Sequence, residues 1–105
     1  MEQREWFKGL EPELRIVVLT QGRPPYQYVV RLETFVEGSW RTIHLFDNVH
    51  GKHDEHHYVG NVKQPADEFF VGAASHALPA AIDLLDSNWS AIMRRWKESR
   101  HERSG

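Results

Sequence analysis

Apolar residues recur in the C-terminal third of the chain at steps of 4, 3, 4, 3 and 4 positions: Leu78, Ile82, Leu85, Trp89, Ile92 and Trp96. This spacing follows the 3.6-residue period of an α-helix, so it predicts one long amphipathic helix over about 75–100. Such a stripe is stable only when another apolar surface covers it. The preceding residues must therefore supply that surface.

Residues 13–71 read as β-strands that can do so. Residues 14–20 are apolar and β-branched, and residues 26–36 alternate between two faces. Glu37 and Gly38 fit a two-residue hairpin turn, so residues 39–46 form the returning strand. This register predicts four neighbouring pairs: Leu32 with Ile43 and Val30 with Leu45 on one face, and Arg31 with His44 and Phe35 with Trp40 on the other.

We therefore expect an α+β fold, in which an antiparallel sheet of four to five strands carries the C-terminal helix on one face. Further strands are expected over 55–60 and 67–71, and residues 1–12 are expected to form an N-terminal arm. The 105 residues contain no linker or repeat, so a single domain over 1–105 accounts for them.

Composition excludes several classes of protein. The chain has no cysteine, which excludes disulfide scaffolds and Cys-ligated metal centres. Its formal net charge of −2 argues against coating duplex DNA by bulk charge. No apolar run approaches the ~18 residues of a membrane helix, and the N-terminus does not resemble a secretory signal. We expect a cytoplasmic protein that does not enter a membrane.

Side chains that can transfer protons or bind a metal are concentrated between residues 44 and 57. This segment holds five of the seven histidines together with two Asp, one Glu and one Lys. A strand–loop–strand path would gather these side chains at one end of the sheet. A solvated polar loop with no special role is one interpretation of this segment. Three functional interpretations compete with it.

The first is a metal site, in which His53 and His56 with Asp47 or Asp54 would supply nitrogen and oxygen ligands. Because His53 lies in a predicted loop and His56 in a strand, no regular spacing fixes such a site, and we expect no metal and no cofactor. The second is RNA cleavage, in which the 2′-hydroxyl is the nucleophile and histidines move the protons. Lys52 or Arg31 would then face the phosphate.

The third interpretation is nucleic-acid contact without chemistry, through charge and stacking on an exposed aromatic side chain such as Trp40.

The run Phe46-Asp47-Asn48-x-x-Gly51-Lys52-x-Asp54-x-x-His57 resembles the TumE-like toxins of toxin-antitoxin pairs. Asp47-Asn48-Val49-His50-Gly51, with Asn88-Trp89 further on, is also similar to a related group of small proteins with an Asp-Asn-x-His-Gly loop. The resemblance covers roughly residues 26–97. Glu55 occupies the place where TumE-like toxins usually have the first histidine of a closing pair, and His57 matches the second.

The resemblance implies a toxin that acts on RNA as a metal-independent ribonuclease, with a cognate antitoxin of helix-turn-helix type. It selects His57 as the catalytic acid or base. We expect three further catalytic residues beside it, namely Asp47, Lys52 and Asp54. Four more residues are expected to contact RNA: Arg31, His44, His50 and His56. The alternative is a non-catalytic regulatory module that binds nucleic acid or protein. A homodimer is compatible with either function.

Overall fold

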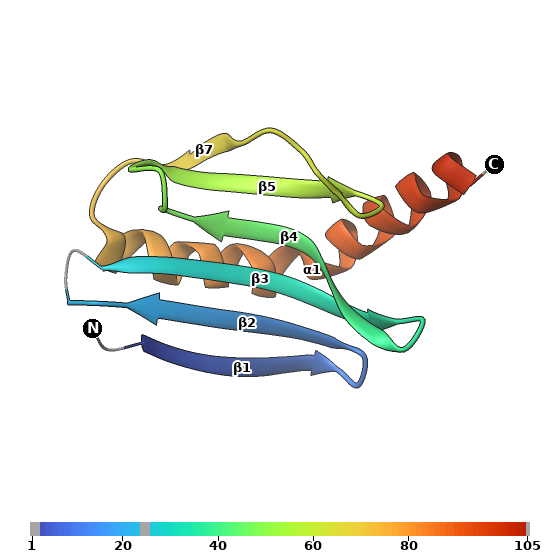
Figure 1. The fold of residues 1–105 in the computed structure, drawn as a ribbon, viewed down its shortest axis with the longest axis horizontal. Helices are drawn as coiled ribbons and strands as arrows, with labels where there is room; N and C mark the ends of the chain where they lie inside the picture. Colours follow the sequence, from blue (N-terminus) through green and yellow to red (C-terminus); the bar gives the residue numbers. More distant parts are fainter. Residues whose placement is uncertain (1–2, 24–25, 105) are drawn as a thin grey trace.

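The computed structural model describes residues 3–23 and 26–104, with side chains described as far as Arg100. It is an α+β fold in which one antiparallel sheet is backed by one long helix (Figure 1). The elements are β1 (Gln3–Glu11), β2 (Leu14–Gln21), β3 (Gln27–Val36), β4 (Ser39–Asp47), β5 (His53–Val59), β6 (Val62–Lys63), β7 (Asp67–Phe70) and α1 (Ala74–Ser104).

The strands follow one another across the sheet in the order β1-β2-β3-β4-β5-β6, and β7 also pairs with β5. The described residues thus form seven strands rather than the expected four to five. The main reason is that the expected N-terminal arm is a strand, β1, paired antiparallel with β2. Met1 and Glu2 of that arm lie outside the described residues. The charged and mostly exposed residues of β1 suit the edge of a sheet.

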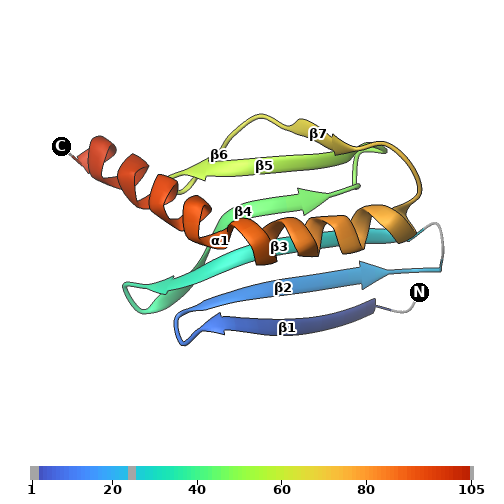
Figure 2. The same cartoon turned by 180° about the vertical axis from the view of Figure 1, so that it is seen from behind.

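The core lies between the sheet and α1, which crosses the face of β3, β4 and β5 (Figure 2). Small residues at Ala77 and Ala81 let the helix approach the strands closely, and both are fully buried. Leu85 and Trp96 of the predicted stripe are buried as well, whereas Trp89 is only half-buried. The helix of 31 residues extends past the predicted end at 100, and no described helix is both long and apolar enough to cross a membrane.

The β3–β4 hairpin confirms the predicted turn and corrects the predicted register. Glu37 and Gly38 have positive φ angles of 52° and 83°, and Phe35 pairs with Trp40. Between Leu32 and Glu33 the register then shifts by one residue, because Ile43 is an extra residue in β4.

Beyond this bulge, three of the predicted pairs are wrong. Leu32 faces His44, Arg31 faces Leu45 and Val30 faces Phe46. Strict alternation would put Ile43 and Phe46 on opposite faces, yet both are buried in the core beneath the helix. The bulge allows the side chains of both Ile43 and Phe46 to be buried there, and it turns the His44 side chain toward the helix.

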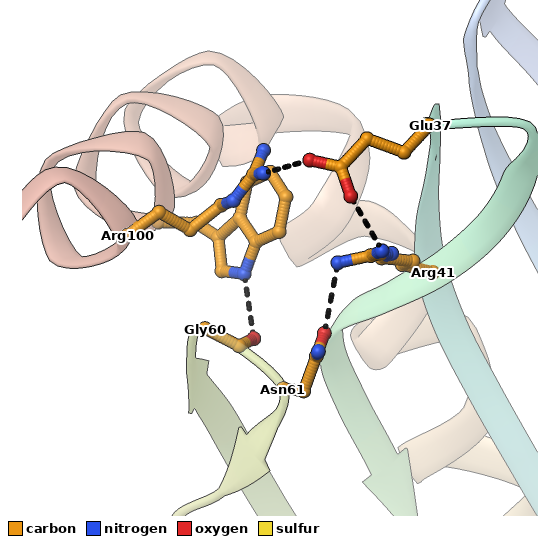
Figure 3. A network of polar contacts seen from close by, with 6 residues as sticks. Glu37, Arg41, Gly60, Asn61 and Arg100 are labelled. Atoms are coloured by element: carbon orange, nitrogen blue, oxygen red, sulfur yellow. Dashed lines mark hydrogen bonds and ion pairs between the residues drawn. The ribbon is translucent and has the colours of Figure 1, made fainter. Parts of the chain in front are cut away.

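Contacts at two turns hold the C-terminal half of α1 in place (Figure 3). The indole nitrogen of Trp96 donates to the Gly60 carbonyl at 2.9 Å. Arg100 donates to Glu37 at 2.9 Å, and the same carboxylate accepts from Arg41 at 3.0 Å. Exposed ion pairs contribute little individually, so the buried Trp96 ring and its hydrogen bond are the stronger anchor.

Candidate functional site

The histidine-rich segment is divided between the two faces of the sheet. Alternation along β5 places Glu55 and His57 on the face that α1 covers, opposite Phe46 and His44 respectively. Asp54 and His56 therefore point to the other face, which we call the open face.

This division separates the residues of the expected catalytic group. Asp47 pairs with Asp54 across β4 and β5 on the open face, so neither carboxylate can orient His57 through the sheet. Arg31 is on the open face too, where it pairs with Glu33 at 3.5 Å. The expectation that Arg31 and His44 share a face is wrong because of the bulge at Ile43.

The loop between β4 and β5 is also remote from His57. His50 and Lys52 are exposed there. Lys52 is five positions before His57, which corresponds to about 16 Å along an extended strand. Asn48 closes the loop against the start of β3: its side chain accepts from the Tyr28 backbone N–H and donates to the Tyr26 carbonyl, both at 2.9 Å. This part of the motif therefore has a structural role.

His53 is held in a similar way. Its Nε2 lies 2.7 Å from the carbonyl oxygen of Gly72, so this nitrogen donates, and its Nδ1 accepts from the Tyr28 hydroxyl at 2.8 Å. Both ring nitrogens are satisfied, so His53 has no free nitrogen for a metal or a proton transfer.

A hydrogen-bonded pair, His44 and Glu55, is the centre of the helix-side cluster. The distance from His44 Nε2 to the Glu55 carboxylate is 2.7 Å, and the His44 side chain is 3% exposed against 34% for Glu55. The hydrogen bond from His44 lowers the pKa of Glu55, and the positive charge of Arg95 adds to this against the opposing effect of burial. Glu55 is therefore an ionised acceptor at neutral pH.

His57 completes this cluster on the strand side. It lies directly opposite His44, and burial lowers its pKa, with Arg95 and His44 acting in the same direction. The acidic groups of Asp67 and Glu55 oppose this shift. A pKa below the usual value of a histidine means that the neutral imidazole prevails at pH 7.

Between the His44–Glu55 pair and α1 lies a cavity of about 440 Å³, lined on the sheet side by His44, Phe46 and Glu55. The helix contributes Asn88, Arg94 and Arg95 among others. Within the described part of the chain, the two arginines have no ion-pair partner. A carboxylate, two imidazoles and two free guanidinium groups can together move protons and hold an anion.

Sequence reasoning did not include Glu55, Asn88 and Arg95 in the site. Glu55 stood out only as a departure from the TumE-like pattern. A usable signal was present for the helix residues, because positions 88 and 95 are seven apart and so lie on one helix face.

On the open face, Asp47, Asp54 and His56 form a second cluster, whose ligand atoms all lie within 4.8 Å of one another. Oxygen and nitrogen donors this close together can hold a metal ion. The two clusters therefore use alternate residues of the same strand, on opposite sides of the sheet.

Searches of curated proteins and of solved structures found no match to this chain. One family model, described as "Domain of unknown function (DUF7718)", matches residues 1–102. That match spans nearly the whole sequence, strands and helix alike. The chain belongs to this DUF7718 family.

Proposed function

We propose that the protein is an RNA-acting toxin of a toxin-antitoxin pair and cleaves RNA without a metal ion. The observation that carries the proposal is the His44–Glu55 hydrogen bond beside His57, next to a cavity that Arg94 and Arg95 line. Cleavage next to a 2′-hydroxyl needs a base, an acid and a cation at the phosphate. This cluster contains all three.

In the proposed reaction, Glu55 accepts the proton of the 2′-hydroxyl as its oxygen attacks the adjacent phosphorus. The bond from phosphorus to the 5′-oxygen breaks, and His57 donates a proton to that oxygen, leaving a 2′,3′-cyclic phosphate. Side chains two positions apart on one strand face are separated by about 7 Å, which allows them to flank a phosphodiester. The bound anion raises the pKa of His57 and so favours its protonated form.

Arg95 supplies the charge that the transition state requires. Its side chain lines the same cavity as Glu55, and its positive charge lowers the pKa of both Glu55 and His57. His44 acts through Glu55: it holds the carboxylate, while its own Nδ1 is buried and has no hydrogen-bond partner among the described residues. His44 is therefore a positioning residue rather than a proton donor to RNA.

The assignment as a toxin rests on the resemblance around residues 46–57 and on this cluster. A cytoplasmic toxin requires a cognate antitoxin, for which the resemblance suggests a helix-turn-helix protein. Expression of the gene with and without its neighbouring reading frame tests this assignment. Growth arrest that the neighbour relieves supports the toxin, and normal growth in both cases contradicts it.

The ribonuclease is tested with purified protein, RNA substrate and EDTA. We expect His57→Ala to lower the cleavage rate by about 10²–10⁴ with little change in RNA affinity, because the lost group acts in the transition state. Arg95→Gln is expected to weaken both binding and rate.

The matched control is His76→Ala, at an exposed position of α1 outside the cluster, which should leave the rate unchanged. A folded His57→Ala variant that cleaves as fast as the parent would show that the site is misassigned. A parent that cleaves no RNA would refute the ribonuclease.

A second candidate is a non-catalytic nucleic-acid-binding module, favoured by the open face. There the Arg15 guanidinium lies over the rings of Phe7 and Trp40, at 4.7 and 3.9 Å from their centroids. Phe7 and Phe35 are exposed, and exposed rings next to a cation suit stacked bases. RNA binding that Phe35→Ala weakens, in a protein that cleaves nothing, would support this candidate.

A further inference from the structure

The open face brings two carboxylates and an imidazole together from β4 and β5. Asp47 and Asp54 are direct cross-strand partners, and His56 is two positions along β5 on the same face. Ligand atoms of one tetrahedral Zn²⁺, bound at about 2.0–2.2 Å, lie about 3.3–3.6 Å apart. The three donor atoms lie within 4.8 Å of one another, so side-chain movements of about 1 Å bring them around a shared ion.

The charges of this cluster are not balanced by other described residues. Asp47 is 5% exposed, and within the described chain its side chain accepts only one long hydrogen bond, from the Val49 N–H at 3.4 Å. Asp54 has no hydrogen bond or ion pair there. Like charges at directly opposed positions repel, and burying the Asp47 carboxylate with a single long hydrogen bond is costly. Arg31 on the same face pairs with Glu33 instead.

The orientation of His56 independently indicates a cation. The residue is 9% exposed, and its Nδ1 lies 2.8 Å from the carbonyl oxygen of Gln64. A carbonyl only accepts, so Nδ1 carries the hydrogen, and in the neutral imidazole Nε2 carries the lone pair. No described donor satisfies Nε2. A histidine whose other ring nitrogen donates to a backbone carbonyl is typical of metal ligands.

We propose that Asp47, Asp54 and His56 bind one divalent transition-metal ion, such as Zn²⁺ or Mn²⁺. The mixed nitrogen and oxygen donors suit these ions. Three protein ligands leave room for water or for Glu68, which faces Asp54 from β7. The ion would fasten β4 to β5, the strand that also carries Glu55 and His57. This proposal replaces the sequence-based expectation of no metal and does not depend on the proposed ribonuclease.

The test uses the full chain, first stripped with EDTA and then titrated with Zn²⁺ alone. Calorimetry should show one equivalent bound. At free Zn²⁺ 100-fold above the Kd, the melting temperature should rise by on the order of 10 °C, because the ion binds only the folded state.

Asp54→Asn gives two effects of opposite sign. In EDTA it should melt at a higher temperature than the parent, since the repulsion between the two carboxylates is removed. With Zn²⁺ it should lose the stabilisation and the stoichiometric binding. Asp83→Asn removes one charge from an exposed helix position and should bind Zn²⁺ like the parent.

Absence of stoichiometric binding to the parent would overturn the site, and so would unchanged Zn²⁺ binding by Asp54→Asn. Imidazole NMR of the parent provides a measurement that needs no variant. Zn²⁺ should shift the His56 signals, whereas shifts confined to His50 or His76 would also overturn the proposal. Because these measurements do not involve RNA, they are independent of cleavage activity.

Discussion

The His44–Glu55 hydrogen bond should contribute measurably to folding stability, and its contribution should depend on pH. A hydrogen bond to a charged group contributes about 1.5–3 kcal/mol, and the 34% exposure of Glu55 favours the lower part of that range. Glu55→Ala also leaves the buried His44 ring without a partner at either nitrogen within the described part of the chain. We therefore expect this substitution to lower the free energy of unfolding by about 2 kcal/mol at pH 7.

The sign of the pH dependence follows from the lowered pKa of Glu55 in the folded protein. Its stabilising effect is fully present above the unfolded value of about 4.3 and is lost as the pH falls through the folded pKa. The difference between parent and Glu55→Ala should therefore shrink on acidification.

Urea denaturation from pH 7 to pH 3 measures this difference directly. Glu5→Ala, at an exposed position of β1, is the matched control and should change stability by less than about 0.5 kcal/mol. A Glu55→Ala penalty below about 0.5 kcal/mol at pH 7, or one that stays constant down to pH 3, would refute the reasoning.

Two further predictions concern the helix. Leu85→Ala, at a fully buried position, should lower the free energy of unfolding measured in urea by about 3–4 kcal/mol. Trp89→Ala, at a half-buried position, should lower it by only about 2 kcal/mol. A larger loss for Trp89→Ala than for Leu85→Ala would mean that Trp89 anchors the helix. Arg95→Gln should raise the pKa of His57 in an NMR titration while leaving it below 6.5, because burial is the larger cause of the lowered value. The lowered pKa of His57 makes the fold less stable as the pH falls from 6.5 through the folded pKa. Arg95→Gln should therefore lose less stability than the parent protein over that pH range. An unchanged His57 titration would place Arg95 away from the cluster.

Local patterns in the sequence determined most of the fold. The helical period from Leu78 to Trp96 specifies one apolar stripe, and alternation over 26–36 specifies a strand with two faces. Glu37-Gly38 specifies the hairpin turn because Gly readily adopts positive φ. These signals depend only on residues close together in the sequence, so the elements can be predicted without the tertiary structure. The charged residues 3–11 carry no such pattern, and they form β1 only because β2 offers its edge.

Which residues meet in each candidate site depends on the tertiary structure, and in particular on the bulge at Ile43. The bulge at Ile43 allows both Ile43 and Phe46 to be buried under α1, and that packing requirement is not visible in the hairpin alone. Because side chains alternate along a strand, a shift of one residue exchanges the faces of everything beyond it. His44 thereby joins Glu55 and His57 beneath Arg95. Asp47, Asp54 and His56, close to these residues in sequence, meet on the opposite side of the sheet.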